Sequence, residues 1–229
     1  MGNETDPTFG KVSLGTTIIS VSFNGGVILA ADSRTSSGNY IGNRATDKIT
    51  PLSDKVYVLR SGSAADTQAI ASYVQLFVAQ HQAESGEEVR VRTVANMIRQ
   101  LAYQNKDMLQ AGMIVAGWDS EKGGQVFGVP LGGTLLPLPY AIGGSGSAYI
   151  SGFCERNFRT GMSEEEALEF IRCAVKLAIA RDASSGGCIR TVIITKEGVK
   201  RHFLPGENIP ATYGEIPVAM ALDRPNVQA

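Results

Sequence analysis

The sequence predicts an α+β fold in which antiparallel sheets are stacked and helices cover their outer faces. Strand patterns come in pairs whose connections are too short for parallel crossovers, so paired strands should be antiparallel. These strand pairs alternate along the chain with pairs of amphipathic helices. The 229 residues can bury one large core, and a single domain is therefore expected.

The first hairpin follows a polar leader. Residues 16–23 and 26–32 are apolar runs separated by Asn24 and Gly25. An Asn-Gly pair between such runs favours a tight hairpin, because both turn positions of the preferred turn need positive φ. The structured body therefore begins at about Thr16.

A strand over 55–60 leads into two predicted helices. The first begins after residues 61–63, and the second covers about 94–109. Apolar residues recur near helical spacing in both, which predicts one layer of two amphipathic helices. The expected apolar positions are Ala65, Ala69, Ala71, Tyr73, Leu76 and Phe77, then Val94, Met97, Ile98, Leu101, Met108 and Leu109.

The second half of the chain repeats the order of strands, helices and strands. The expected segments are a hairpin of 112–118 with 125–129, helices over 148–159 and 163–181, and a hairpin of 189–195 with 199–204. Residues 163–166, Ser-Glu-Glu-Glu, have the spacing of a capping box, which marks a helix start. Four prolines from Pro205 onward indicate an extended carboxyl-terminal arm.

Composition and charge argue against several functional classes. With 19% charged residues and a net charge of -1, the chain has no basic surplus for nucleic acid, which is not an expected partner. Its apolar stretches are far shorter than the ~20 residues that cross a bilayer. The first fifteen residues lack the apolar core of a secretory signal, so we expect no membrane association and an intracellular location.

The familiar hydrolase and metal motifs are missing from the sequence. Cys154, Cys173 and Cys188 are too far apart for a Cys-x-x-Cys pair and should be free thiols. His81 and His202 lie in neither Gly-rich nor acidic surroundings, and we expect both at the surface. No Gly-x-Ser-x-Gly or His-Glu-x-x-His occurs. The glycine run at 143–147 is not a P-loop, and either a simple turn or a functional loop fits it.

Gly15, Thr16 and Thr17 stand at the junction between the leader and the first strand. A threonine acts as a nucleophile when its own free α-amine is the base, which requires a cleavage that leaves it as the first residue. A removable leader ending in Gly15 would supply that condition. An ordinary Gly-Thr at the start of a strand is the alternative.

Five segments together resemble the catalytic beta subunits of the proteasome, which are N-terminal-nucleophile hydrolases. They are 16–35, Thr46 to Ile49, 60–66, the glycine run at 143–147, and 181–187. The resemblance covers Gly15 to about Leu204. It implies a four-layer αββα sandwich, with residues 1–15 as a propeptide removed autolytically and 16–229 as one domain whose arm begins at about 205.

The resemblance implies a threonine endopeptidase that needs neither metal nor cofactor. The implied catalytic residues are Thr16 as nucleophile, Asp32, Lys48, Ser145, Asp182 and Ser185. A lysine ammonium near Thr16 would lower the pKa of its hydroxyl and amine, and Asp32 would hold that lysine charged. Lys48 would thus act as an electrostatic partner, and a role as proton shuttle stays open. Gly62, expected to begin a helix, would donate its backbone N–H to the oxyanion.

Substrate specificity is predicted from Arg60, two residues before Gly62. The resemblance implies that substrate adds as a β-strand between 35–37 and 62–64. Arginine at this place resembles the caspase-like, post-acidic branch, because a guanidinium pairs with a carboxylate through two hydrogen bonds. The other implied pocket residues are Thr35, Thr46, Thr50 and Ala64. An ordinary surface arginine at position 60 is the alternative.

The resemblance also implies partners and a cellular role. They are other alpha and beta subunits in stacked seven-membered rings, unfolded polypeptides as substrates, and ubiquitin-dependent degradation in the cytoplasm and nucleus. A non-catalytic ring subunit of the same fold stays open, although Thr16, Asp32 and Lys48 argue against it. A different N-terminal-nucleophile amidohydrolase, or the simpler bacterial ATP-dependent relative, is the remaining alternative.

Overall fold

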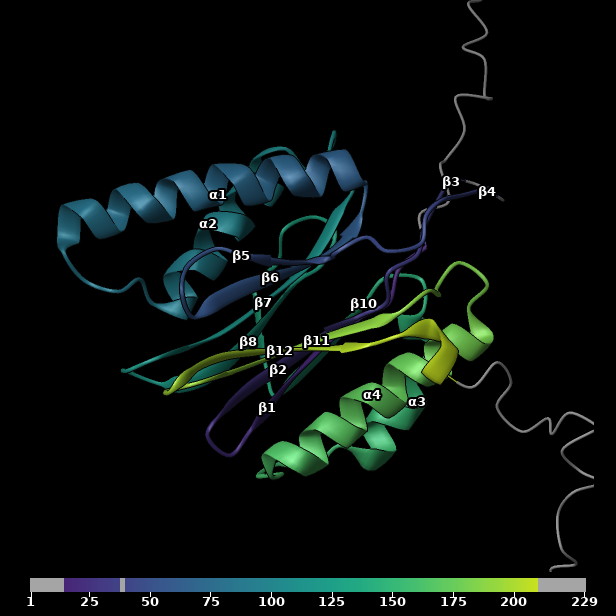
Figure 1. Ribbon diagram of the computed structural model, residues 1–229. Coiled ribbons are helices and arrows are strands. Elements are labelled where there is room, and N and C mark those ends of the chain that lie inside the picture. The colour runs from purple at the N-terminus through teal and green to yellow at the C-terminus, as the bar shows by residue number, and fades with distance from the viewer. Residues whose placement is uncertain (1–14, 38–39, 210–229) are drawn as a thin grey trace, which may run out of the picture.

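Two five-stranded antiparallel sheets lie face to face in the computed structural model, which describes residues 15–37 and 40–209. Two helices cover the outer face of each sheet (Figure 1). The predicted αββα sandwich is therefore confirmed. Residues 1–14 of the predicted leader, and residues 210–229 of the predicted arm, lie outside the described residues.

The first sheet has the strand order β10-β1-β2-β11-β12. Its strands are β1 (Ile18–Phe23), β2 (Gly26–Ala31), β10 (Tyr140–Gly143), β11 (Ile189–Thr195) and β12 (Gly198–Leu204). The expected hairpin of β1 and β2 is present, with Ile18 opposite Ala31 and Phe23 opposite Gly26. Of the two turn residues only Gly25 has positive φ, at 118°, so the expectation that both would is wrong.

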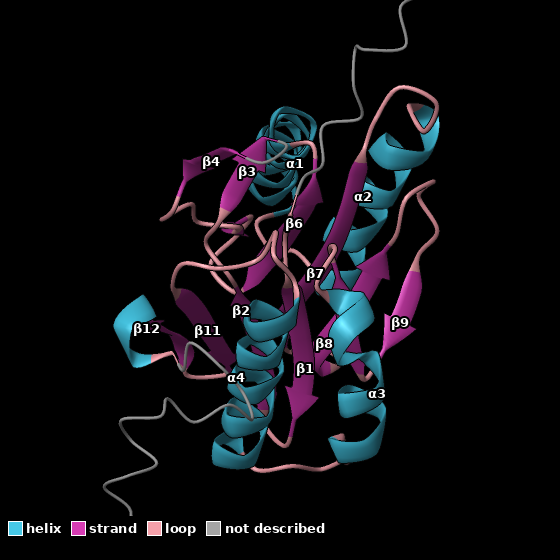
Figure 2. Ribbon diagram, turned by 90° about the vertical axis from the view of Figure 1, so that its right-hand side faces the viewer, coloured by secondary structure: helices cyan, strands magenta, loops and turns pink. Residues whose placement is uncertain are grey.

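The second sheet has the order β5-β6-β7-β8-β9. Its strands are β5 (Ile49–Pro51), β6 (Val56–Gly62), β7 (Ala111–Asp119), β8 (Gly123–Val129) and β9 (Leu136–Leu138). A separate two-stranded ribbon of β3 (Thr35–Ser37) and β4 (Tyr40–Asn43) projects from the end of the sandwich at which α1 begins (Figures 1 and 2).

The helices form the outer layers. α1 (Ala64–Ser85) and α2 (Val91–Gln104) cover the second sheet, and α3 (Ser147–Asn157) and α4 (Glu164–Arg181) cover the first. The capping box predicted at the start of α4 is confirmed. The Ser163 hydroxyl accepts from the Glu166 backbone nitrogen, and the Glu166 carboxylate accepts from the Ser163 backbone nitrogen. No helix among the described residues is long and apolar enough to cross a membrane.

The apolar face predicted for α1 is partly wrong. Tyr73, Leu76 and Phe77 are 59%, 62% and 41% exposed, while residues such as Ile70 and Val74 face the sheet. Apolar residues of α1 lie on more than one side of the helix, so their spacing in the sequence does not decide which side faces the sheet. In α2 the expected apolar residues up to Leu101 face the sheet, as predicted. Met108, however, is 88% exposed, because α2 ends four residues earlier, at Gln104.

The core lies in three layers, one between the sheets and one under each helix pair. Ile18, Leu29 and Leu59 are completely buried between the sheets. These buried side chains anchor the strands, and the predicted catalytic residues follow or precede the strand ends.

Candidate active site

The predicted catalytic residues converge from five separate segments of the chain. Thr16 immediately precedes β1, Asp32 follows β2, and Lys48 precedes β5. Ser145 lies between β10 and α3, while Asp182 and Ser185 lie between α4 and β11. The antiparallel pairing of β10, β1 and β2 brings the start of β1 and the ends of β2 and β10, and with them Thr16, Asp32 and Ser145, to one end of the sandwich. Most of the set is buried, with Thr16 5% and Asp32 1% exposed.

Asp32 and Lys48 form a buried ion pair. Lys48 Nζ donates to Asp32 Oδ1 at 2.7 Å and to the backbone oxygen of Arg34 at 2.8 Å. The other carboxylate oxygen accepts from the backbone nitrogens of Arg34 at 3.2 Å and Gly186 at 3.0 Å. Burial lowers the pKa of Lys48 below its ordinary value, and the attraction of Asp32 offsets only part of that effect. This lysine therefore gives up its proton more readily than an exposed one.

The Thr16 hydroxyl and the Lys48 amine reach the same carbonyl oxygen. Thr16 Oγ1 donates to the Gly15 oxygen at 2.6 Å, and Lys48 Nζ lies 3.4 Å from that oxygen. Gly15 is still joined to Thr16 in the described chain. A hydroxyl beside a carbonyl whose oxygen faces a cation is the arrangement that favours nucleophilic attack, because the cation stabilises the oxyanion that forms.

A second group of hydrogen bonds surrounds the Thr16 nitrogen. That nitrogen donates to Ser145 Oγ at 3.1 Å, and Ser145 in turn donates to Asp182 Oδ2 at 2.6 Å. Ser185 Oγ donates to the same carboxylate oxygen, also at 2.6 Å. Sequence reasoning missed Thr17, whose hydroxyl lies 2.7 Å from Ser185 Oγ.

Arg60 lies half-buried beside β5 and α1. Its guanidinium donates to Thr50 Oγ1 at 2.9 Å, to the Asp47 backbone oxygen at 2.9 Å, and more weakly to Thr67 Oγ1 at 3.5 Å. Burial lowers the pKa of Arg60, and Asp47 opposes that effect. Its backbone nitrogen donates to the Lys48 backbone oxygen at 3.1 Å, which joins the end of β6 to the residue that precedes β5.

The other predicted pocket residues are placed around this strand end. Thr35 and Thr46 bond to each other through their hydroxyls at 2.8 Å. Ala64 is the first residue of α1 and is exposed. Thr67, which contacts the Arg60 guanidinium, was not found from the sequence, because a single threonine inside a helix belongs to no recognisable motif.

Gly62 does not begin α1, so that expectation is wrong. It is the last residue of β6, and Ser63 caps the helix that starts at Ala64. Its φ of 99° lies in the region that favours glycine, and a Cβ there would overlap the Gln110 backbone oxygen. The backbone therefore turns sharply at this point, and the helix dipole starts two residues after Gly62.

Gly144 packs against the main chain of Thr16, and a matched pair of substitutions tests this contact. Gly144 and Gly161 both have φ of 81°, but a Cβ on Gly144 would overlap the Thr16 backbone, whereas one on Gly161 meets nothing within 4 Å. Gly161→Ala should lower the free energy of unfolding by about 1–2 kcal/mol, because alanine disfavours the left-handed conformation at this position. Gly144→Ala should destabilise the full-length chain more in urea unfolding, and equal losses would contradict this contact.

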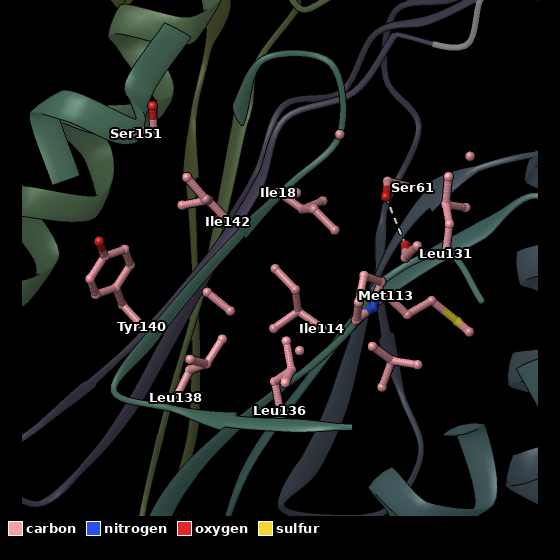
Figure 3. A pocket seen from close by; sticks show the side chains of 18 of the residues that line it. Ile18, Ser61, Met113, Ile114, Leu131, Leu136, Leu138, Tyr140, Ile142 and Ser151 are labelled. Atoms are coloured by element: carbon pink, nitrogen blue, oxygen red, sulfur yellow. Dashed lines mark hydrogen bonds between the residues drawn. The ribbon is translucent and has the colours of Figure 1, made fainter. Parts of the chain in front are cut away.

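A pocket of about 670 Å³ opens next to this cluster, beside the edge strands β9 and β10 of the two sheets. Figure 3 shows its apolar wall, to which Ile114, Leu136, Leu138 and Ile142 contribute. Gly62 and Gly144 also line it, whereas Lys48 and Asp32 do not. The pocket thus borders the candidate site without containing its charged residues.

The remaining candidate groups lie apart from this cluster. Cys154, Cys173 and Cys188 are free, and burial raises the pKa of Cys154 to about 12, which makes that thiol unreactive. His81 and His202 are exposed, as expected. Within residues 15–37 and 40–209, no group of three or more His, Cys, Asp or Glu side chains is arranged to hold a metal ion.

Comparison with known proteins gives consistent matches. The model of a family described as "Proteasome subunit" matches residues 12–194. "Proteasome subunit beta type-6" of Arabidopsis thaliana is 55% identical over 204 residues, which cover 89% of this chain and 88% of that protein. "Proteasome subunit beta type-1" of Saccharomyces cerevisiae is 52% identical over 199 residues, covering 86% and 92% respectively. "Proteasome subunit beta type-6" of Dictyostelium discoideum is 51% identical over 199 residues, covering 87% and 93%.

Proposed function

Because the chain belongs to the proteasome beta-type subunit family, we propose that it is a catalytic threonine endopeptidase of the core particle and cleaves after acidic residues. As a member of that family, it assembles with other alpha and beta subunits in that particle. The cytoplasm and nucleus are the proposed places of action. The observation that carries the catalytic proposal is the meeting of the Thr16 hydroxyl and the Lys48 amine at the Gly15 carbonyl oxygen.

Removal of the leader is the first proposed reaction. Thr16 Oγ1 attacks the Gly15 carbonyl carbon and gives up its hydroxyl proton, which passes to the Thr16 nitrogen, while the carbonyl electrons move to the oxygen that faces Lys48. Collapse of this intermediate breaks the Gly15–Thr16 C–N bond, the nitrogen departs with that proton, and an ester to Oγ1 remains. Water then hydrolyses the ester, which frees residues 1–15 as an acid and leaves Thr16 with a free amine and hydroxyl.

Peptide cleavage uses the same atoms. The free amine of Thr16 takes the hydroxyl proton as Oγ1 attacks a substrate carbonyl, and it returns that proton to the departing amine. Water then hydrolyses the ester. The lowered pKa that burial gives Lys48 supports its proposed role as a proton relay, while the attraction of Asp32 supports its role as a cation beside the hydroxyl. Ser145 and Asp182 hold the nitrogen in position.

Intact mass and a peptide panel separate this proposal from a non-catalytic ring subunit. A catalytic subunit should lose residues 1–15 on assembly, and its particles should hydrolyse fluorogenic peptides that end in Glu or Asp. A chain that retains its leader in assembled particles would support the non-catalytic alternative. A chain that is processed but cleaves only after apolar or basic residues would leave the threonine protease proposal standing and overturn the acidic preference.

Arg60→Leu tests the acidic preference directly. We expect cleavage after Glu to fall and cleavage after Leu to rise, because the buried carboxylate of the substrate loses its partner. The loss in transition-state binding of the Glu peptide should be about 2–5 kcal/mol, as for truncating one member of a desolvated charge pair. The measurement is kcat/KM for matched peptides ending in Glu or Leu, on particles whose other active sites are blocked.

Arg60→Lys is the matched control. A lysine keeps the charge but cannot reproduce the planar fork that now binds Thr50 and the Asp47 backbone, so activity on the Glu peptide should recover only in part. If the ratio of Glu to Leu cleavage is unchanged in Arg60→Leu, the guanidinium does not face the substrate. The post-acidic assignment then loses its support, whereas the role of Thr16 does not depend on it.

A further inference from the structure

Thr17 contacts both hydrogen-bonded groups of the candidate site, and no step proposed above uses it. Its side chain is completely buried. Its backbone nitrogen donates at 2.8 Å to Asp32 Oδ1, the same oxygen that accepts from Lys48 at 2.7 Å. Its hydroxyl lies 2.7 Å from Ser185 Oγ, which bonds Asp182. This one residue therefore joins the ion pair to the hydrogen bonds around the Thr16 nitrogen.

The direction of each hydrogen bond in this chain follows from the number of protons available. Asp182 as a carboxylate only accepts, and Ser145 and Ser185 each have one hydroxyl proton, which points to Asp182 Oδ2. Ser185 has no proton left for Thr17, so the Thr17 hydroxyl donates to Ser185. Ser145, whose proton is also committed, accepts from the Thr16 nitrogen at 3.1 Å.

The packing around Thr17 leaves its hydroxyl no alternative partner in solvent. Gly146, the N-cap residue of α3, lies so close that a Cβ there would overlap Thr17 Oγ1. The backbone oxygen of Thr17 accepts from the Asp32 nitrogen at 3.1 Å, which fixes the main chain as well. A buried hydrogen-bond chain of this kind holds its members in one arrangement, because breaking any bond leaves a polar group unsatisfied.

We propose that Thr17 is a positioning residue for the nucleophile and acts through Ser185 and Asp182. This inference rests on the proposed threonine protease function. The Thr17 hydroxyl keeps the Ser185 proton directed to Asp182, and Asp182 holds Ser145 against the Thr16 nitrogen. Once the leader is removed, that nitrogen is the amine that takes the nucleophile's proton. Its orientation and its proton affinity therefore both depend on Thr17.

Three substitutions separate the hydroxyl from the shape of the side chain. Thr17→Val and Thr17→Ala remove the hydroxyl, and Thr17→Ser keeps it. We expect kcat to fall about 10-fold in the first two, the effect of losing one partner of a buried hydrogen bond, with little change in KM. Thr17→Ser should stay close to wild type. All are measured on assembled particles with the Glu peptide.

The pH profile is a readout that a purely structural role would not change. Without the Thr17 bond, Ser185 is free to turn from Asp182, and the less satisfied carboxylate then stabilises the protonated Thr16 amine more strongly. The acidic limb of kcat/KM, where that amine must lose its proton, should therefore move to higher pH in Thr17→Val and Thr17→Ala. The limb should not move in Thr17→Ser.

A double-mutant cycle with Ser185→Ala completes the test. If Thr17 acts through Ser185, Thr17→Ala should cause little further loss in the Ser185→Ala background. Fully additive losses, or an unmoved acidic limb, would overturn the positioning role. A third outcome would also overturn it. If Thr17→Val and Thr17→Ala fail to assemble, while Thr17→Ser assembles and has the pH profile of the wild type, the Thr17 hydroxyl is needed for folding or assembly only. Thr16→Ala particles are run beside them: activity that depends on Thr16 but not on Thr17 overturns this inference alone.

Discussion

Thr16→Ala is expected to abolish peptide hydrolysis by this subunit and to leave residues 1–15 attached. The proposed mechanism uses the same hydroxyl for both reactions, and it already contacts the Gly15 carbonyl oxygen at 2.6 Å. The loss in kcat should reach about 10⁴–10⁶-fold, as when the nucleophile of a hydrolase is removed. The measurements are hydrolysis of the Glu peptide by assembled particles and the intact mass of the subunit.

Thr16→Ser is the matched control for the alanine substitution. It keeps a hydroxyl on the same carbon, so leader removal and part of the peptidase activity should remain. The other catalytic subunits must be inactive in both experiments, because they could trim the leader. A Thr16→Ala chain that still begins at position 16 under those conditions would contradict autolysis, and one that still hydrolyses the peptide would contradict the nucleophile assignment.

The fold was predictable where local patterns are long and agree with their surroundings. The hairpin of β1 and β2 and the capping box of α4 each carry a signal within a few residues. The strands β3, β5 and β9 are only three residues long, too short for alternation to show. The face of α1 could not be chosen from spacing, because Tyr73, Leu76 and Phe77 are as apolar as the residues that face the sheet.

The candidate site was predictable only as far as side chains carry recognisable chemistry. Thr16, Asp32 and Lys48 were named from the sequence, and the structure brings them together. The backbone oxygen of Arg34, which accepts from Lys48 at 2.8 Å, could not be found in this way, because every residue has one. Thr17 was missed for a related reason, since the role proposed for it depends on its contact with Ser185, 168 positions later in the chain.

Lys48→Ala is expected to remove peptidase activity, to block leader removal and also to destabilise the fold. Lys48 and Asp32 are 5% and 1% exposed, so the substitution leaves a buried carboxylate without its cation. Breaking such a pair costs about 3–5 kcal/mol. Three backbone nitrogens, those of Thr17, Arg34 and Gly186, still donate to Asp32, which places the expected loss near the lower end. Urea unfolding and peptide hydrolysis measure the two effects separately.

Two further variants separate catalysis from stability at this pair. Replacing both partners, as Lys48→Met with Asp32→Asn, removes the unpaired charge and should recover most of the lost stability but no activity. Lys48→Arg keeps a cation but does not give up its proton, so it should restore stability more than turnover. If the double variant were folded and hydrolysed the Glu peptide like wild type, Lys48 would be a structural charge only. If Lys48→Arg regained full activity, the positive charge alone would suffice, and the lowered pKa that burial gives Lys48 would have no part in proton transfer.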